Sequence, residues 1–83
     1  MTIPDTPEYS VYQFFMDGSY EMLCHFVLAE PAARMFAQCT TSLGAQLGTT
    51  QRVIITDGGD SIVFEWVYGK GITFPPQGSD TVQ

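Results

Sequence analysis

The chain has 83 residues, with 9 acidic against 3 basic side chains and a formal net charge of -6. A chain of this length forms one small domain and buries a smaller fraction of its surface than a larger one does. The acidic balance argues against binding to nucleic acid, whose phosphates repel negative charge, and against anionic lipid, which attracts clustered lysine and arginine.

Both ends of the chain lack hydrophobic periodicity. Residues 1–8 and 75–83 contain prolines and polar residues, and we expect two flexible tails around a single domain over residues 9–74. The N-terminus has no positively charged segment followed by an apolar run, which a secretory signal requires. No stretch reaches the roughly 18 consecutive apolar residues of a spanning helix. These features predict a soluble, cytoplasmic protein.

Residues 9–28 alternate with a period of two around the dipeptide Asp17-Gly18. Asp-Gly is typical of a two-residue hairpin turn, which would pair Met16 with Ser19. In that register one face is predicted to line the core: Tyr9, Val11, Gln13, Phe15, Tyr20, Met22, Cys24 and Phe26. The opposite face then carries large apolar side chains beside a histidine: Tyr12, Phe14, Met16, Leu23 and His25.

A helix is predicted over residues 31–47, between Pro31 at its first position and Gly48 as the left-handed residue after its end. Three- and four-residue spacing gives one apolar stripe: Ala32, Phe36, Cys39, Leu43 and Leu47, with Met35 at its edge. Polar residues fall opposite: Arg34, Gln38 and Thr41. A row of small residues runs beside the stripe and would permit close approach to the sheet or to another helix: Ala33, Ala37, Thr40 and Gly44.

The segment "RVIITDGGDSIVFEW", residues 52–66, predicts a second hairpin that turns at Gly58-Gly59. Calcium prefers six to eight oxygen ligands, and "DGGD" offers two carboxylates, so a turn is favoured over a cation loop. The turn pairs Arg52 with Glu65. One face becomes Val53, Ile55, Ile62, Phe64, Trp66 and Tyr68, and the other carries Arg52, Ile54, Thr56, Ser61, Val63, Glu65 and Val67. Residues 72–74 suggest a short extended segment that ends at Pro75.

These elements predict an α+β fold in two layers, ββαββ, in which a four-stranded antiparallel sheet of two hairpins packs on one helix. One helix covers only one face of such a sheet. The uncovered face would therefore expose a contiguous apolar patch, which soluble monomers rarely do.

The residues that carry chemistry do not form a recognisable site. Cys24 and Cys39 lack a disulfide or metal spacing and fit better as reduced core residues. His25 follows Cys24 in a strand, where neighbouring side chains point to opposite faces, so the two cannot act as base and nucleophile. The glycines near Lys70 are not followed by a helix, as a phosphate loop requires. We expect no catalytic residue, no metal and no cofactor.

The sequence therefore predicts a non-enzymatic accessory or protein-interaction module of unknown biochemical function that forms a homodimer, with another protein partner as a possibility. The predicted interface on the non-helix face consists of Tyr12, Phe14, Met16, Leu23, His25, Ile54, Val63 and Val67. An edge strand or the small-residue row of the helix would be other routes to a dimer. The alternative is a small-molecule binding protein or minor enzyme on the same face, with these polar contacts: Tyr12, Glu21, His25, Arg52 and Glu65.

Overall fold

The computed structural model describes residues 7–75. Within these residues the chain forms five strands and two helices: β1 (Tyr9–Phe15), β2 (Tyr20–Val27), α1 (Ala29–Thr40), α2 (Leu43–Leu47), β3 (Thr50–Thr56), β4 (Ile62–Val67) and β5 (Gly71–Phe74). The predicted α+β class with an antiparallel sheet is confirmed. The tails predicted over residues 1–8 and 75–83 lie mostly outside the described residues.

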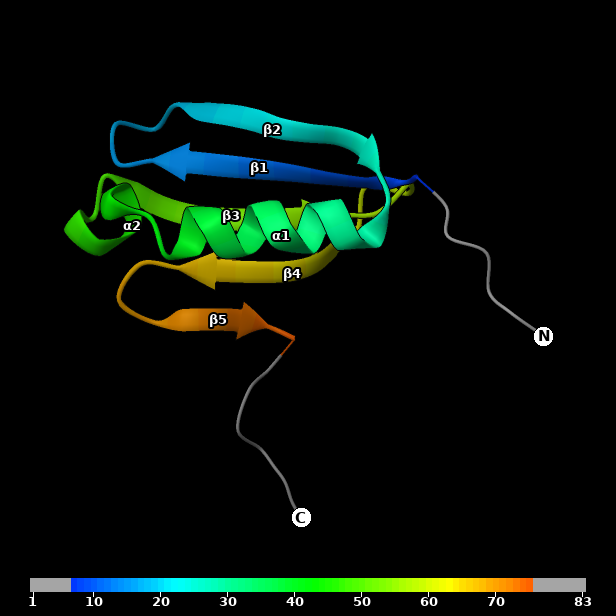
Figure 1. Ribbon diagram of the computed structural model, residues 1–83. Coiled ribbons are helices and arrows are strands. Elements are labelled where there is room, and N and C mark those ends of the chain that lie inside the picture. The colour runs from blue at the N-terminus through cyan, green and yellow to red at the C-terminus, as the bar shows by residue number, and fades with distance from the viewer. Residues whose placement is uncertain (1–6, 76–83) are drawn as a thin grey trace, which may run out of the picture.

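The strands form one antiparallel sheet in the order β2-β1-β3-β4-β5. Because β1 is antiparallel to both of its neighbours, β2 and β3 run parallel, and the helical segment between them crosses the sheet. Helix α1 lies on one side of the sheet, in front of β3 in Figure 1, and packs against β1, β2 and β3. That side is called the helix side below.

The prediction of four strands is wrong, because the extended segment at residues 72–74 joins the sheet as β5. Val67 pairs with Gly71, and Trp66 pairs with Ile72. The Lys70 amide donates to the Val67 carbonyl at 3.0 Å, and Gly69 has a φ of 83° within this turn. A positive φ at that position favours glycine, so the local sequence does carry a turn signal.

The prediction of one helix over residues 31–47 is also wrong. Helix α1 begins two residues earlier, where Pro31 in the first turn lacks only an N–H that would have no helical partner. It ends at Thr40, and Leu43 and Leu47 of the predicted stripe are exposed on α2. The remaining stripe is confirmed, since Ala32, Phe36 and Cys39 are buried.

The break between the helices follows from three consecutive hydroxyl side chains, those of Thr40, Thr41 and Ser42. Thr41 Oγ1 donates to the Ala37 carbonyl at 2.7 Å, and Ser42 Oγ donates to the Cys39 carbonyl at 2.8 Å. Ser42 Oγ also accepts from the Ala45 amide at 3.2 Å and so caps the start of α2. These local hydrogen bonds compete with a continuous helix. Gly48 ends α2 in the left-handed conformation, as predicted.

The first hairpin turns through three residues instead of two. The Phe15 amide donates to the Ser19 carbonyl at 2.8 Å, and the Gly18 amide donates to the Phe15 carbonyl at 3.0 Å. Gly18 has a φ of 91°. This is a turn followed by a left-handed glycine, the usual three-residue hairpin, which an Asp-Gly pair fits as well as a two-residue one.

The extra loop residue shifts the pairing by one, and a one-residue shift moves side chains to the other face. Phe14 now pairs with Tyr20, and Tyr12 pairs with Met22. Tyr20 and Met22 therefore lie on the side away from α1, not in the predicted core. A β-bulge then restores the predicted pairing of Val11 with Cys24.

The second hairpin confirms the turn at "DGGD". The Asp57 amide donates to the Ser61 carbonyl at 2.9 Å, and Asp57 Oδ1 accepts from the amides of Gly59 and Ser61 at 2.9 and 3.0 Å. The register differs from the prediction by two residues, so Arg52 pairs with Val67 and Ile54 with Glu65. A shift of two keeps most side chains on their predicted face. Ile62 is an exception, because a bulge places it opposite Thr56.

The core lies between α1 and the central strands, and its buried members are Val11, Ala32, Phe36, Cys39, Val53 and Ile55. Helix α1 leaves β4 and β5 partly uncovered on the helix side, where Phe64 of β4 remains 41% exposed. Neither described helix has the length and hydropathy that crossing a membrane requires.

Candidate functional site

The candidate site is the sheet surface away from α1, called the open face from here on. Its members follow from the strand pairing and side-chain contacts: Tyr12, Phe14, Tyr20, Met22, Arg52, Ile54, Ile62, Glu65, Val67 and Thr73. They come from all five strands. Neither described helix packs over them, because α1 and α2 contact the helix side of the sheet.

Three aromatic rings form a cluster on the β1–β2 part of the open face. The ring centroid of Tyr20 lies 5.6 Å from that of Phe14 and 6.2 Å from that of Tyr12. Both separations fall in the favourable range for tilted aromatic pairs. Tyr20 is nonetheless 63% exposed and Met22 is 46% exposed. The cluster is therefore ordered by its own contacts while still presenting apolar surface to solvent.

The charged groups of the open face neutralise one another. The Arg52 guanidinium pairs with the Glu65 carboxylate, and it also lies 5.2 Å from the centroid of the Phe14 ring. Thr73 Oγ1 donates to Glu65 Oε1 at 2.7 Å. The hydrogen bond from Thr73, followed by that from Arg52, lowers the pKa of the Glu65 carboxyl. Glu65 is thus held ionised beside its cation, and the open face carries no net charge.

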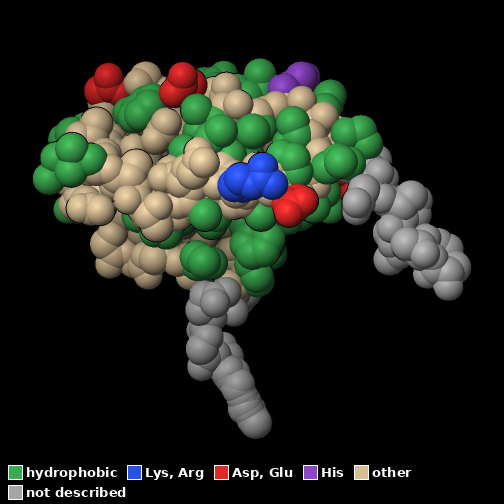
Figure 2. Space-filling view, viewed as in Figure 1, with side chains coloured by type: hydrophobic (Ala, Val, Ile, Leu, Met, Phe, Trp, Pro, Cys, Tyr) green, Lys and Arg blue, Asp and Glu red, His purple; other side chains and the backbone are tan. Residues whose placement is uncertain are grey.

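The other described acidic side chains lie away from the open face. They belong to the turns, to helix α1, to the helix side of β2 and to the segment before β1: Glu8, Asp17, Glu21, Glu30, Asp57 and Asp60. Figure 2, viewed as in Figure 1, shows acidic and basic side chains scattered over the helix side among hydrophobic ones. Within residues 7–75, the unpaired negative charge consequently lies outside the open face.

Four of the eight predicted interface residues lie on the open face: Tyr12, Phe14, Ile54 and Val67. Ile54 is only 7% exposed and so contributes little to the surface of this face. Leu23 and Val63 were placed on this face by the predicted register, and that placement is wrong, since both pack against the core on the helix side. The bulges in β2 and β4 turn these two side chains over.

The remaining two predicted residues are exposed. Met16 belongs to the first turn, and His25 stacks on the ring of Phe26 with centroids 4.2 Å apart. The sequence interpretation missed Tyr20, Met22 and Ile62. The sequence did contain a signal for Tyr20 and Met22. Asp17-Gly18 also fits a three-residue turn, and that turn would have placed both side chains on the open face.

The polar groups of the predicted ligand site do not converge. Glu21 pairs with Gln13, whose neighbour Val11 is in the core, so Glu21 lies on the helix side. Arg52 and Glu65 are engaged with each other.

The sheet edges are poorly suited to pairing with another strand. In β2 the ladder is interrupted by register shifts, and Phe26 has a φ of 53°. At the other edge β5 has only four residues. Bulges and short strands are common means of protecting edges.

Within the small-residue row of the helical segment, Gly44 is engaged within the chain, whereas Ala33 and Ala37 are exposed. A Cβ added at Gly44 would lie 3.0 Å from Thr50 Oγ1. Gly44 therefore permits close packing of α2 on β3.

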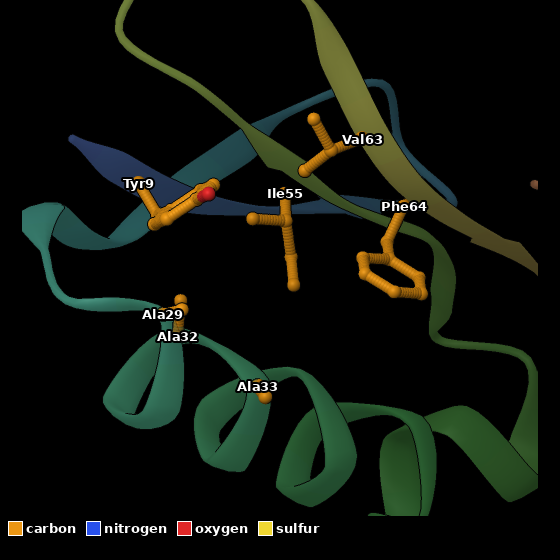
Figure 3. Close-up of a pocket in the computed structure, with 7 residues that line it drawn as sticks. All are labelled: Tyr9, Ala29, Ala32, Ala33, Ile55, Val63 and Phe64. Atoms are coloured by element: carbon orange, nitrogen blue, oxygen red, sulfur yellow. The ribbon is translucent and has the colours of Figure 1, made fainter. Parts of the chain in front are cut away.

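An apolar pocket lies on the helix side, between the first turns of α1 and the sheet (Figure 3). Three alanines of α1 form one wall: Ala29, Ala32 and Ala33. The sheet contributes the other lining side chains: Tyr9, Ile55, Val63 and Phe64. Its volume is about 190 Å³.

The two cysteines are free thiols near the core. Burial, followed by the neighbouring Cys24 and Glu21, raises the pKa of the Cys39 thiol. A thiol held protonated is a poor nucleophile, so Cys39 acts here as a small apolar side chain.

No protein-family description matches the chain, and comparison with curated proteins and with solved structures finds no significant match.

Proposed function

We propose that the protein is a non-enzymatic interaction module that associates with a second copy of itself through the open face. The single observation that carries the proposal is an exposed aromatic cluster beside an internally neutralised ion pair, on a face that no other described element covers. Contiguous exposed apolar surface of this kind is typical of interaction sites. Burying it would also add to the modest core of a short chain.

The distribution of charge favours a second copy as the partner. A chain with a formal charge of -6 repels its own copies over most of its surface. The open face is where that repulsion is weakest, because Arg52 and Glu65 cancel within it. Two-fold dimers, in which the same patch meets itself, are the commonest soluble assemblies.

Association through the face has more support than association through an edge strand. The bulged β2 and the short β5 offer little uninterrupted backbone for strand addition. The proposal includes a cytoplasmic location, for which two free, mostly buried thiols are the support. The alternative, a ligand or reaction on the open face, has less support because Glu21 lies on the other side of the sheet.

The proposal is tested by placing a charge in the open face and measuring molar mass by light scattering after size exclusion. Met22→Glu introduces a carboxylate beside Tyr12, and association through the open face would have to bury this charge without a partner. Leu43→Glu is the matched control, because it places the same charge at a 68% exposed leucine of α2. Circular dichroism shows whether both variants keep the fold.

We expect twice the monomer mass for the unmodified protein and for Leu43→Glu, and the monomer mass for Met22→Glu. A monomeric unmodified protein at the highest soluble concentration would contradict the proposal. Loss of the dimer in the Leu43→Glu variant alone would move the interface to the helix side.

A further inference from the structure

The pocket beneath α1 exists because the first turns of this helix carry alanines where larger side chains would fill the space. Ala29, Ala32 and Ala33 face the pocket in Figure 3, and one turn later the larger Phe36 packs with its ring centroid 5.9 Å from that of Phe64. Interiors normally pack with few voids larger than a water molecule. A space left open beside a packed aromatic pair is therefore a distinct feature of this fold.

From these features we propose that the pocket binds a small, neutral aromatic molecule of one or two rings. The site lies on the opposite side of the sheet from the open face, so the proposal goes beyond self-association and does not depend on it. Four properties of the pocket support it: its size, its lining, its shape and its access to solvent.

The size of the pocket fits a ring. Its volume is about 190 Å³. For comparison, an apolar cavity of about 150 Å³ in another protein binds benzene. The space is too small for a folded peptide segment or a long acyl chain. It matches one or two fused rings.

The lining selects for an uncharged and largely apolar ligand. None of the lining residues carries a charge, and the hydroxyl of Tyr9 is the polar side-chain group among them. Burying an ion there would be costly, since no opposite charge is at hand. Water is also held poorly, because an ordered molecule needs two to four polar partners. A neutral ring would replace weakly held water.

The shape of the pocket favours a planar ligand. In Figure 3 the rings of Tyr9 and Phe64 lie at opposite ends of the pocket, with Ile55 between them. Aromatic side chains gain most from other rings in tilted or offset arrangements. Ala29, Ala33 and Phe64 are exposed at the surface, so a ligand can enter without unfolding of the core.

The test titrates the full chain with indole and follows the methyl and amide signals by NMR. We expect saturable shifts at Ile55, Val63 and Ala32, with a dissociation constant on the order of 0.1 to 1 mM, as is common for a ligand of about nine non-hydrogen atoms. Benzoate serves as the charged probe of similar size. It should bind at least about tenfold more weakly than indole.

A second experiment fills the pocket with a larger side chain from helix α1. Ala33→Leu places a larger side chain on an exposed lining position of α1, and leucine is a good helix former. Ala37→Leu is the matched control, one turn later on the same helix and outside the lining. Ala33→Leu should weaken indole binding at least about tenfold, whereas Ala37→Leu should leave it unchanged. Ala29→Leu takes the place of Ala33→Leu if the latter fails to fold.

Several results would overturn the proposal: no saturable shift with indole, equal binding of benzoate, or equal loss of binding in both leucine variants. Shifts confined to Tyr12, Phe14 and Tyr20 would also overturn it, because they would place the probe on the open face. Light scattering on the same samples shows whether the oligomeric state changes, which separates this test from that of self-association.

Discussion

Gly18 and Gly48 adopt the same backbone conformation in different surroundings, with φ angles of 91° and 89°. A Cβ added at Gly18 would meet nothing within 4 Å, whereas one at Gly48 would lie 3.1 Å from the ring of Tyr68. We expect Gly18→Ala to lower the free energy of unfolding by about 1–2 kcal/mol through backbone strain alone. Gly48→Ala should lower it by about 1 kcal/mol more, because the ring must also move. Urea denaturation of both variants measures the difference, and equal losses would mean that Tyr68 moves aside freely.

Glu65 should make the folded protein less stable at acidic pH. Its carboxyl pKa is lowered in the folded protein by Thr73 and Arg52, so the unfolded chain binds the proton more readily. The contribution to stability is therefore complete above the ordinary glutamate value of 4.5 and is lost as the pH falls through the lower folded value. Glu65→Gln removes the contribution of the carboxylate, so the stability of this variant should fall less on acidification than that of the unmodified protein. Thermal melts from neutral to acidic pH test this, since parallel profiles for the two proteins would contradict it.

Three hydroxyl residues divide the helical segment into α1 and α2, and we expect them to contribute differently to stability. Ser42 caps α2 and also bonds to the Cys39 carbonyl, so Ser42→Ala should cost about 1 kcal/mol in the free energy of unfolding. Thr41 donates to the Ala37 carbonyl, which the Thr41 amide already satisfies at 3.1 Å. Thr41→Ala should therefore change stability by less than about 0.5 kcal/mol. Chemical denaturation compares the two, and a loss of stability for Thr41→Ala as large as that for Ser42→Ala would contradict this prediction.

Hydrophobic alternation predicted where the strands lie but not how they pair. Near the first turn the three-residue loop moved Tyr20 and Met22 to the open face, and bulges moved Leu23 and Val63 away from it. A bulge depends on the contacts of both strands, so no local pattern in either strand reveals it. Four of the eight residues predicted for the interface therefore lie on the open face, and their role in an interface stays a prediction.

The helix prediction failed for a different reason. Apolar spacing extends from Ala32 to Leu47 without interruption, and it predicts one helix. Local hydrogen bonds from Thr41 and Ser42 override that spacing and leave Leu43 exposed. The Ser and Thr residues at the break were visible in the sequence, and their capping role is the signal that would have found it.

For the whole molecule, the strand order could not be derived from the sequence, because the pairing of β1 with β3 joins segments far apart in the chain. That order places the two best-covered strands in the middle. Val11 of β1 and Val53 of β3 are fully buried, whereas β2 and β5 form the edges. Backbone opening should therefore be rarest in β1 and β3, where exchange requires global unfolding.

The difference in amide exchange between the central and the edge strands can distinguish a dimer through the open face from a dimer through an edge strand. Face-to-face association stabilises the folded state by mass action, so amide hydrogen exchange in β1 and β3 should slow as protein concentration rises. The outward amides of β2 stay unpaired in such a dimer, and their exchange should remain fast. Addition of a strand at β2 would instead protect those amides first, because they would gain hydrogen bonds. Exchange measured by NMR at low and high concentration tests this, with Met22→Glu as the reference in which concentration should have no effect. Slowing confined to β2 would contradict association through the face, whatever the molar mass.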